Sequence, residues 1–422
     1  MTHDPPKPLN LDGAKRSRRG AASAALILAF LGTALAGVVR GQVITEFPIP
    51  TPGSNPQQGI AAGPDGNVWF TEYLGLHIGR ITTDGVVTEF PGPQGAFGLA
   101  AGPDGNLWFT EYVKNKIGRI TTAGVITEFS LPTASSFAIG IAAGPDGNLW
   151  FTESDSNHPG SGKIGQITTA GVVTEFSIPS AFSNPQGIAA GPDGNLWFTE
   201  GHENVIGRIT TAGAVTEFPI PTAFSSPQAI AAGPDGNLWF TEQTPFQIGR
   251  ITTTGVVTEF PVPTFNSFEF TIQGITGGPD GNIWFTEGSA NQIGRITPAG
   301  VVTEFPIPTV ASEPAGITAG PDGNLWFTER GFHVDQIGRI TTGAPSPSTV
   351  VIDGCDSGVP NSTLEGSDTI QDLVDQCAAG AKNHGAFVSC VTHLTNDLKA
   401  QGIITGAQKA AIQGCAAQAQ IP

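Results

Sequence analysis

The sequence is poor in charged residues and has one methionine, two tyrosines and four cysteines. Charged residues make up 13% of its 422 residues, whereas 57 glycines and 34 prolines indicate many turns and few long helices. Basic residues are scarce, because 19 Lys and Arg stand against 36 Asp and Glu, a formal net charge of −17. This balance argues against nucleic acid or an anionic membrane as a partner, since both need basic patches. It fits simple solubility best, and it also permits cationic ligands or metal ions.

Long apolar runs are also missing, with one exception near the N-terminus. The basic stretch 15–19 precedes an apolar run at 21–37, and Ala34-Leu35-Ala36 fits a cleavage site. We therefore expect residues 1–36 to be a signal peptide, and the mature protein to be secreted or periplasmic. An uncleaved anchor is the alternative, because the run is marginally long enough to span a membrane. After cleavage no membrane span is expected.

What dominates the sequence is a repeat of seven copies. Each copy contains Gly-Pro-Asp-Gly-Asn-x-Trp-Phe-Thr-Glu, then Ile-Gly-Arg-Ile-Thr (Gln166 replaces the arginine once), and a Thr-Glu-Phe segment. The copies begin 39–47 residues apart and hold all seven tryptophans. They begin at Gly63, Gly102, Gly144, Gly191, Gly233, Gly278 and Gly320.

Each copy has the pattern of four short strands. In the second copy these are 98–101, 107–111, 117–121 and 125–129, separated by Pro-Asp-Gly-Asn and Ala-Gly turns. Four strands in about 40–45 residues is the period of a propeller blade. Glycines and prolines interrupt any helical period between them. The sequence therefore predicts an all-β protein, a seven-bladed β-propeller over residues 42–342.

The ends of the repeat predict how the ring closes. A Thr-Glu-Phe strand at 45–47 precedes the first full copy, while the last copy stops near 341 without one. We expect the N-terminal strand to complete the last blade, which removes an open sheet edge. In this topology the loops between second and third strands share one face with the loops between blades. These loops vary most, so we expect any ligand to bind this variable face.

The repeat resembles that of the streptogramin B lyase (virginiamycin B lyase) family over roughly residues 42–342. The resemblance implies opening of a cyclic depsipeptide lactone by elimination, with a base and a divalent metal, typically Mg²⁺. It also implies histidines just before the Ala/Gly-Ile pair of the last two blades, where this chain has Gln273 and Ala315. Neither side chain can act as a base near neutral pH. Glu329 is the candidate for a metal-binding glutamate of the family, although every blade has a glutamate there.

Two sets of side chains on the variable face are candidate ligand-binding residues. Amides at the start of the first strand in four blades could bind a small molecule, peptide or glycan, or hold channel waters. Histidines after four of the second strands could bind a metal with Asp155, Glu203 or Asp335, though exposed loop histidines are common. The amides are Gln58, Gln186, Gln228 and Gln273, and the histidines are His77, His158, His202 and His333.

Other repeated residues have structural interpretations. Glutamates end every second strand and arginines recur in the third strand, so we expect cross-strand ion pairs between them. The Asp-Gly-Asn segments are expected to be turns, because they lack the further ligands of a calcium loop. The tryptophans are expected to pack between blades.

Beyond the repeat the pattern changes. Residues 343–349 have the composition of a linker, and residues 350–422 have helical patterns with a capping box at Thr405 and Gln408. All four cysteines lie in this tail, which fits two disulfides in any of three connectivities. A metal site is less favoured, because no Cys-x-x-Cys pair occurs. The cysteines of this expected helical disulfide module are Cys355, Cys377, Cys390 and Cys415.

Three functions remain alternatives at the level of the sequence. The favoured one is a secreted, monomeric propeller that binds or scaffolds a ligand and lacks the family's base. The second is an active metal-dependent carbon–oxygen lyase that inactivates streptogramin B antibiotics, using Mg²⁺, Glu329 and loop histidines. The third is a structural surface protein attached through the tail.

Overall fold

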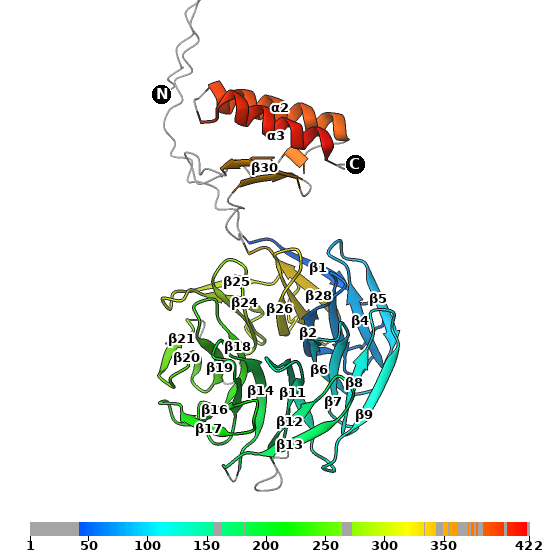
Figure 1. Cartoon of the computed structure of the whole chain (residues 1–422), viewed down its shortest axis with the longest axis vertical. Coiled ribbons are helices and arrows are strands. Elements are labelled where there is room, and N and C mark those ends of the chain that lie inside the picture. Colours follow the sequence, from blue (N-terminus) through cyan, green and yellow to red (C-terminus); the bar gives the residue numbers. More distant parts are fainter. Residues whose placement is uncertain are drawn as a thin grey trace, which may run out of the picture.

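A computed structural model describes residues 42–154, 162–180, 182–263, 272–332 and 334–342, with residues 349–352, 355–360, 370, 373–374, 377–378, 383–400 and 403–419 of the tail. The expected leader, His158, His333 and Asp155 lie outside the described residues. Seven antiparallel four-stranded sheets form the blades of a ring (Figure 1). The predicted seven-bladed β-propeller is therefore confirmed.

The four strands of a blade follow one another outward from the centre of the ring. The first strands are β2 (Pro56–Ala62), β6 (Ala96–Ala101), β10 (Ala138–Ala143), β14 (Pro185–Ala190), β18 (Pro227–Ala232), β22 (Ile272–Gly277) and β26 (Pro314–Ala319). The second strands are β3 (Val68–Glu72), β7 (Leu107–Glu111), β11 (Leu149–Glu153), β15 (Leu196–Glu200), β19 (Leu238–Gln243), β23 (Ile283–Glu287) and β27 (Leu325–Glu329). The third strands are β4 (His77–Ile81), β8 (Lys116–Ile120), β12 (Lys163–Ile167), β16 (Val205–Ile209), β20 (Phe246–Ile251), β24 (Gln292–Ile296) and β28 (Gln336–Ile340). The outer strands are β5 (Val87–Pro91), β9 (Ile126–Ser130), β13 (Val173–Ser177), β17 (Val215–Pro219), β21 (Val257–Pro261), β25 (Val302–Pro306) and β1 (Ile44–Pro48).

The N-terminal strand closes the ring as expected. The last blade has the order β1-β28-β27-β26, and β1 pairs antiparallel with β28 from Ile44 opposite Ile340 to Pro48 opposite Gln336. Each first strand contacts the first strand of the next blade, and β26 contacts β2. In the second blade β7 has the predicted bounds, and the other three strands begin or end within two residues of prediction.

The turn between first and second strands is built around its aspartate. In blade 1, Trp69 Nε1 donates to Asp65 Oδ1 at 3.0 Å and Asn67 Nδ2 donates to Asp65 Oδ2 at 2.8 Å. Partial burial opposes ionisation of Asp65, but these hydrogen bonds outweigh it and lower its pKa. Gly66 has φ +74°, a left-handed conformation that favours glycine. The tryptophan bond recurs in all seven blades, which confirms the turn interpretation.

The tryptophans form the core between neighbouring blades, as expected. Trp69 of blade 1 is fully buried among residues of blade 2, including Ala96 and Leu99, and stacks on Phe90 with ring centres 5.2 Å apart. All seven tryptophans have no exposed surface. Because truncating such a side chain costs about 3–5 kcal/mol, these residues carry much of the propeller's stability.

The prediction of cross-strand ion pairs between the repeated glutamates and arginines is wrong. In register, Arg80 lies opposite Trp69, and its guanidinium is 5.6 Å from the Trp69 ring centre and 3.6 Å from Asp65 Oδ2. Glu72 lies opposite His77 on the other face of the sheet, because side chains alternate along a strand. The arginine–tryptophan contact recurs in the five other blades that have this arginine.

The tail forms a module with its own core (Figure 1). Helix α2 (His384–Ala400) packs on helix α3 (Gly406–Gln418), and α3 contacts the hairpin of β29 (Thr349–Ile352) and β30 (Cys355–Pro360). The hairpin was not expected from the helical pattern, and β29 begins one residue inside the expected linker. The predicted capping box is confirmed, since Gln408 N donates to Thr405 Oγ1 and Thr405 N to Gln408 Oε1.

Two disulfides cross-link the module. Cys355 pairs with Cys415, and Cys377 pairs with Cys390, which is one of the three connectivities left open by the sequence. The first bridge joins β30 to α3, and the second holds Cys377 against α2. Among the described residues, no helix is long and apolar enough to span a membrane.

Candidate functional site

The starts of the seven first strands surround the centre of the variable face. Each first strand is irregular there: in blade 3, Ala138 pairs with Glu153, but regular pairing resumes only with Ile141 opposite Phe151. A register shift occurs at the start of the first strand in every blade, and in blade 1 it spans one residue more, from Pro56 to Ile60. Such bulges bend a strand and redirect its side chains, and they are common beside binding sites.

A threonine hydroxyl fixes most of these strand starts. Thr199 Oγ1 accepts from the N–H of Gly187 in its own blade at 3.0 Å and donates to the carbonyl of Gln228 in the next blade at 2.6 Å. Each hydroxyl uses both its donor and its acceptor, so it couples the strand start of one blade to that of its neighbour. Equivalent pairs of bonds are made by Thr110, Thr152, Thr286 and Thr328.

Three of the four predicted amides lie side by side on adjacent blades. Gln186, Gln228 and Gln273 occupy the starts of β14, β18 and β22, and the first two are half-buried while Gln273 is 8% exposed. Gln58 of β2 is half-buried and is separated from them by Ala315 of β26, which is fully buried. The amides therefore form an arc over blades 4–6, with one further amide in blade 1.

The other side of this face carries an aromatic row that the sequence interpretation missed. Tyr73, Phe97, Tyr112 and Phe137 are all half-buried, with successive ring centres 6.2, 6.0 and 5.3 Å apart. The row runs over blades 1–3 and includes both tyrosines of the chain. A signal was present in the sequence, because each tyrosine directly follows the glutamate of a second strand. The centre of the variable face is thus aromatic on one side and amide-bearing on the other.

Apolar side chains project from the loops around this centre. Phe224 is 85% exposed, Val310 82% and Phe182 58%, and each lies in a loop between two blades. In the described part of the chain, all eleven non-glycine residues with positive φ lie in loops of the variable face, Phe224 among them at φ 60°. Sparsely populated backbone conformations concentrate at functional sites, where the surrounding structure holds them.

A positive charge lies where blades 7 and 1 meet. Arg330 Nη1 donates to Gln57 Oε1 at 2.6 Å. Burial lowers the pKa of Arg330, and the nearby charge of Glu313 acts in the opposite direction. An arginine stays charged in proteins, so this position carries a permanent positive charge.

Glu329, the candidate metal ligand, lies inside blade 7 and not at the surface. Its side chain is fully buried, and burial together with the charge of Glu46 raises its pKa to about 8. Mg²⁺ binds ionised carboxylates, so an ion at this carboxyl would have to displace the proton that burial favours. The same burial raises the pKa to about 7 or 8 at Glu72, Glu111, Glu153, Glu200, Glu242 and Glu287.

Two of the four predicted histidines lie within the described residues. His202 is exposed in the loop between β15 and β16. His77 is the first residue of β4, and its Nδ1 is 3.6 Å from Glu72 Oε2. His77, Glu72 and Glu89 have ligand atoms within 4.8 Å of one another, the one such group that could hold a metal among the described residues. The expected pairing with His158 and His333 stays a prediction.

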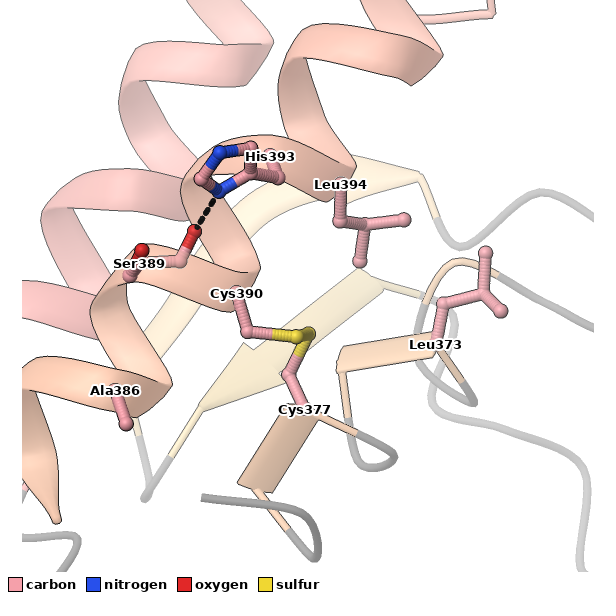
Figure 2. A pocket seen from close by; sticks show the side chains of 7 residues that line it. All are labelled: Leu373, Cys377, Ala386, Ser389, Cys390, His393 and Leu394. Atoms are coloured by element: carbon pink, nitrogen blue, oxygen red, sulfur yellow. Dashed lines mark hydrogen bonds between the residues drawn. A yellow bond between two sulfur atoms is a disulfide. The ribbon is translucent and has the colours of Figure 1, made fainter. Parts of the chain in front are cut away.

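The tail module has a separate surface cavity beside its second disulfide. Its volume is about 660 Å³, and Figure 2 shows it along one face of α2. His393 Nδ1 lies 2.7 Å from the carbonyl oxygen of Ser389, so this nitrogen has a partner within its own helix. The lining residues are Leu373, Cys377, Ala386, Ser389, Cys390, His393 and Leu394.

Comparisons with known proteins agree with the repeat. Residues 31–193 and 159–346 match the model of the Virginiamycin B lyase family. The solved virginiamycin B lyase from Staphylococcus aureus is 41% identical, with a TM-score of 0.65, over 71% of this chain and 99% of that one. A catalytically inactive histidine-to-alanine variant of the S. aureus enzyme, solved with quinupristin, is also 41% identical, with a TM-score of 0.64, over 71% of this chain and 99% of that one.

A curated virginiamycin B lyase from Bordetella parapertussis is 45% identical over 51 residues, which are 12% of this chain and 17% of that protein. The chain thus spans about a sixth of the length of that curated relative in this match. The two matches of the family model together cover the whole ring, residues 42–342. Taken with the seven-bladed ring and its repeated motifs, these matches show that the chain belongs to the virginiamycin B lyase family.

Proposed function

We propose that this protein binds a ligand that carries both amide and apolar groups, such as a cyclic peptide or depsipeptide, on the variable face and does not open its ring. The observation that carries this proposal is the pair of residues at the starts of β22 and β26. The family resemblance implies histidines there, and this chain has Gln273, which is 8% exposed, and the fully buried Ala315. Elimination needs a group that accepts a proton, and neither residue can do so.

Two further observations support binding without turnover. The solved relative in which a histidine is replaced by alanine is described as catalytically inactive, so that protein depends on a histidine. The candidate metal ligand Glu329 is buried, and burial favours its protonated form.

The ligand class follows from the two sides of the central face. Gln186, Gln228 and Gln273 offer amide donors and acceptors over blades 4–6, whereas Tyr73 and Tyr112 offer aromatic surface over blades 1–3. A ligand with backbone amides and apolar side chains can satisfy both sides at once. Exposed loop residues such as Phe224 supply further apolar contact.

We also propose that the protein acts outside the cytoplasm. The basic and apolar segments of residues 1–36 support a cleaved leader. The two disulfides of the tail support an oxidising compartment, because such bridges are rare in reducing ones.

The test is to incubate the protein lacking residues 1–36 with a streptogramin B depsipeptide, with and without Mg²⁺. Binding is followed by calorimetry, and the lactone by chromatography and mass spectrometry. We expect binding and an intact lactone. A linear product of unchanged mass, lost on chelation, would show elimination and support the lyase alternative instead. Hydrolysis is distinguished by the mass of one added water.

A variant that restores the two histidines tests whether their absence alone accounts for the expected lack of lyase activity. The double variant Gln273→His, Ala315→His restores both histidines that the resemblance implies. If the scaffold otherwise retains the family's binding geometry, this variant gains lactone-opening activity. Gln58→His is the matched control, because it places a histidine at the same strand position in blade 1, where the resemblance assigns no role.

A further inference from the structure

The third-strand residue that pairs with the second-strand glutamate also lies near a glutamate of the outer strand. In blade 3, Lys163 Nζ lies 2.7 Å from Glu175 Oε2, and in blade 2, Lys116 Nζ lies 2.5 Å from Glu128 Oε2. The charge of Lys116 also acts on the buried Glu111. The scaffold thus places a cation between these carboxyl groups in two of its blades.

Blade 1 has the same two carboxyl groups but no ammonium. Glu72 has no exposed surface, and no amide, hydroxyl or ammonium group donates to either of its oxygens. His77 replaces the lysine, and its Nδ1 is also buried without a hydrogen-bond partner, 3.6 Å from Glu72 Oε2. The third group, Glu89, is held in place because its Oε1 accepts from the N–H of Thr51 at 2.9 Å.

We propose that Glu72, His77 and Glu89 bind one Zn²⁺ ion, which joins β3, β4 and β5 of blade 1. Their ligand atoms lie within 4.8 Å of one another, so small side-chain rotations bring all three to the roughly 2.0–2.2 Å that zinc requires. One imidazole and two carboxylates are a ligand set that suits zinc, with water completing the tetrahedron.

The surroundings favour a cation at this place. Asp335 adds negative charge nearby, and its own oxygens are held by the N–H groups of Gly53 and Asn55 at 2.6 and 2.9 Å. In the other four blades the residue paired with the second-strand glutamate is a valine or a glutamine, so a single site is expected. These residues are Val205, Gln247, Gln292 and Gln336.

The site is independent of the proposed ligand-binding centre, and its role is structural. The Thr51 loop that Glu89 holds follows β1, the strand that closes the ring. A metal that orders Glu89 therefore supports the junction between blades 7 and 1. Because an ion that binds only the folded state stabilises it by mass action, Zn²⁺ is expected to raise the melting temperature of the propeller.

The experiment uses the full mature chain, treated with chelator and then titrated with ZnCl₂. Bound metal is measured by elemental mass spectrometry and affinity by calorimetry. We expect one Zn²⁺ per chain. His77→Gln introduces the residue found in blades 5–7, so it should fold normally and weaken zinc affinity by more than the roughly 10–100-fold that loss of a second-sphere partner costs. His202→Gln, which removes an exposed histidine in blade 4, should leave it unchanged.

The converse variant makes the test stricter. Gln336→His places a histidine beside Glu329 and Glu46 in blade 7, and we expect a second bound Zn²⁺. The proposal is overturned if the wild-type chain binds no stoichiometric zinc, or if His77→Gln binds it as tightly as wild type. In that case Glu72 and Glu89 share a proton in place of a metal.

Discussion

At the scale of single residues, the seven glutamates of the second strands are unusual because they are buried carboxyl groups with raised pKa values. Each lies at or next to the end of a second strand and has no ion pair with the arginine of the third strand, because that arginine lies on the other face of the sheet. In blade 4, burial first, and then the charges of Glu217 and Glu203, raise the pKa of Glu200 to about 8. The folded protein therefore binds protons that the unfolded chain releases above a pKa of about 4.3.

A pH dependence of stability follows. Between about pH 4.5 and 8 the folded state holds more protons than the unfolded state, so the free energy of unfolding falls as pH rises, by up to about 1.4 kcal/mol per pH unit for each such group. We expect a lower urea midpoint at pH 8.5 than at pH 5.5. Glu200→Gln should reduce this slope, and Asp84→Asn, at an exposed turn, should not. A midpoint that rises with pH would contradict the prediction.

The glycine of each third strand is a second position at which a single residue matters, because the neighbouring strand leaves no room for a Cβ. A Cβ at Gly207 would lie 2.1 Å from Cζ of Phe198 on the neighbouring strand. Gly207→Ala is expected to destabilise the propeller by about 1–3 kcal/mol through overpacking. Gly201→Ala is the matched control in the same blade, because its Cβ would meet nothing closer than 3.6 Å. Urea unfolding of both variants checks this, and equal midpoints would contradict it.

At the scale of elements, the strands and turns could be predicted because the same pattern of turn and strand residues occurs in seven copies. Turn residues such as Asp65 and Gly66 specify local geometry, so the predicted strand bounds of the second blade agree with the structure to within two residues. The side of the sheet on which Arg80 lies was missed, since it depends on register between strands. The aromatic row was missed for a related reason: Tyr73 and Phe97 belong to different blades and meet only when neighbouring blades pack together. The hairpin of the tail, at β29 and β30, has too few residues for a clear period.

The two disulfides of the tail should differ in their effect. Cys355–Cys415 closes a loop of 60 residues and Cys377–Cys390 one of 13. In the chain-entropy model the longer loop contributes about 1.4 kcal/mol more. We expect Cys355→Ser, Cys415→Ser to lower the module's stability more than Cys377→Ser, Cys390→Ser. Calorimetry of the full chain can follow both, with the propeller transition as an internal reference that neither pair should shift.

At the scale of the whole molecule, β1 supplies the outer strand of the last blade and so fastens the two ends of the ring together. Removing residues 1–48 would leave β28 with an unpaired outer edge, a template for association. We expect this truncation to melt at a lower temperature and to self-associate, whereas removal of residues 1–41 should leave a stable monomer. Light scattering coupled to gel filtration measures both forms. Equal behaviour of the two would show that β1 is dispensable.

The same closure brings the two ends of the ring together. Val43 N donates to Thr341 Oγ1 at 2.9 Å, and Thr341 N donates to the Val43 carbonyl at 3.0 Å. A short linker could therefore fuse these ends, and new termini could be opened in any loop between blades, giving a family of circular permutants. The place at which the ring is interrupted then decides that the chain before β1 and the chain that continues to the disulfide module join the ring at the same point.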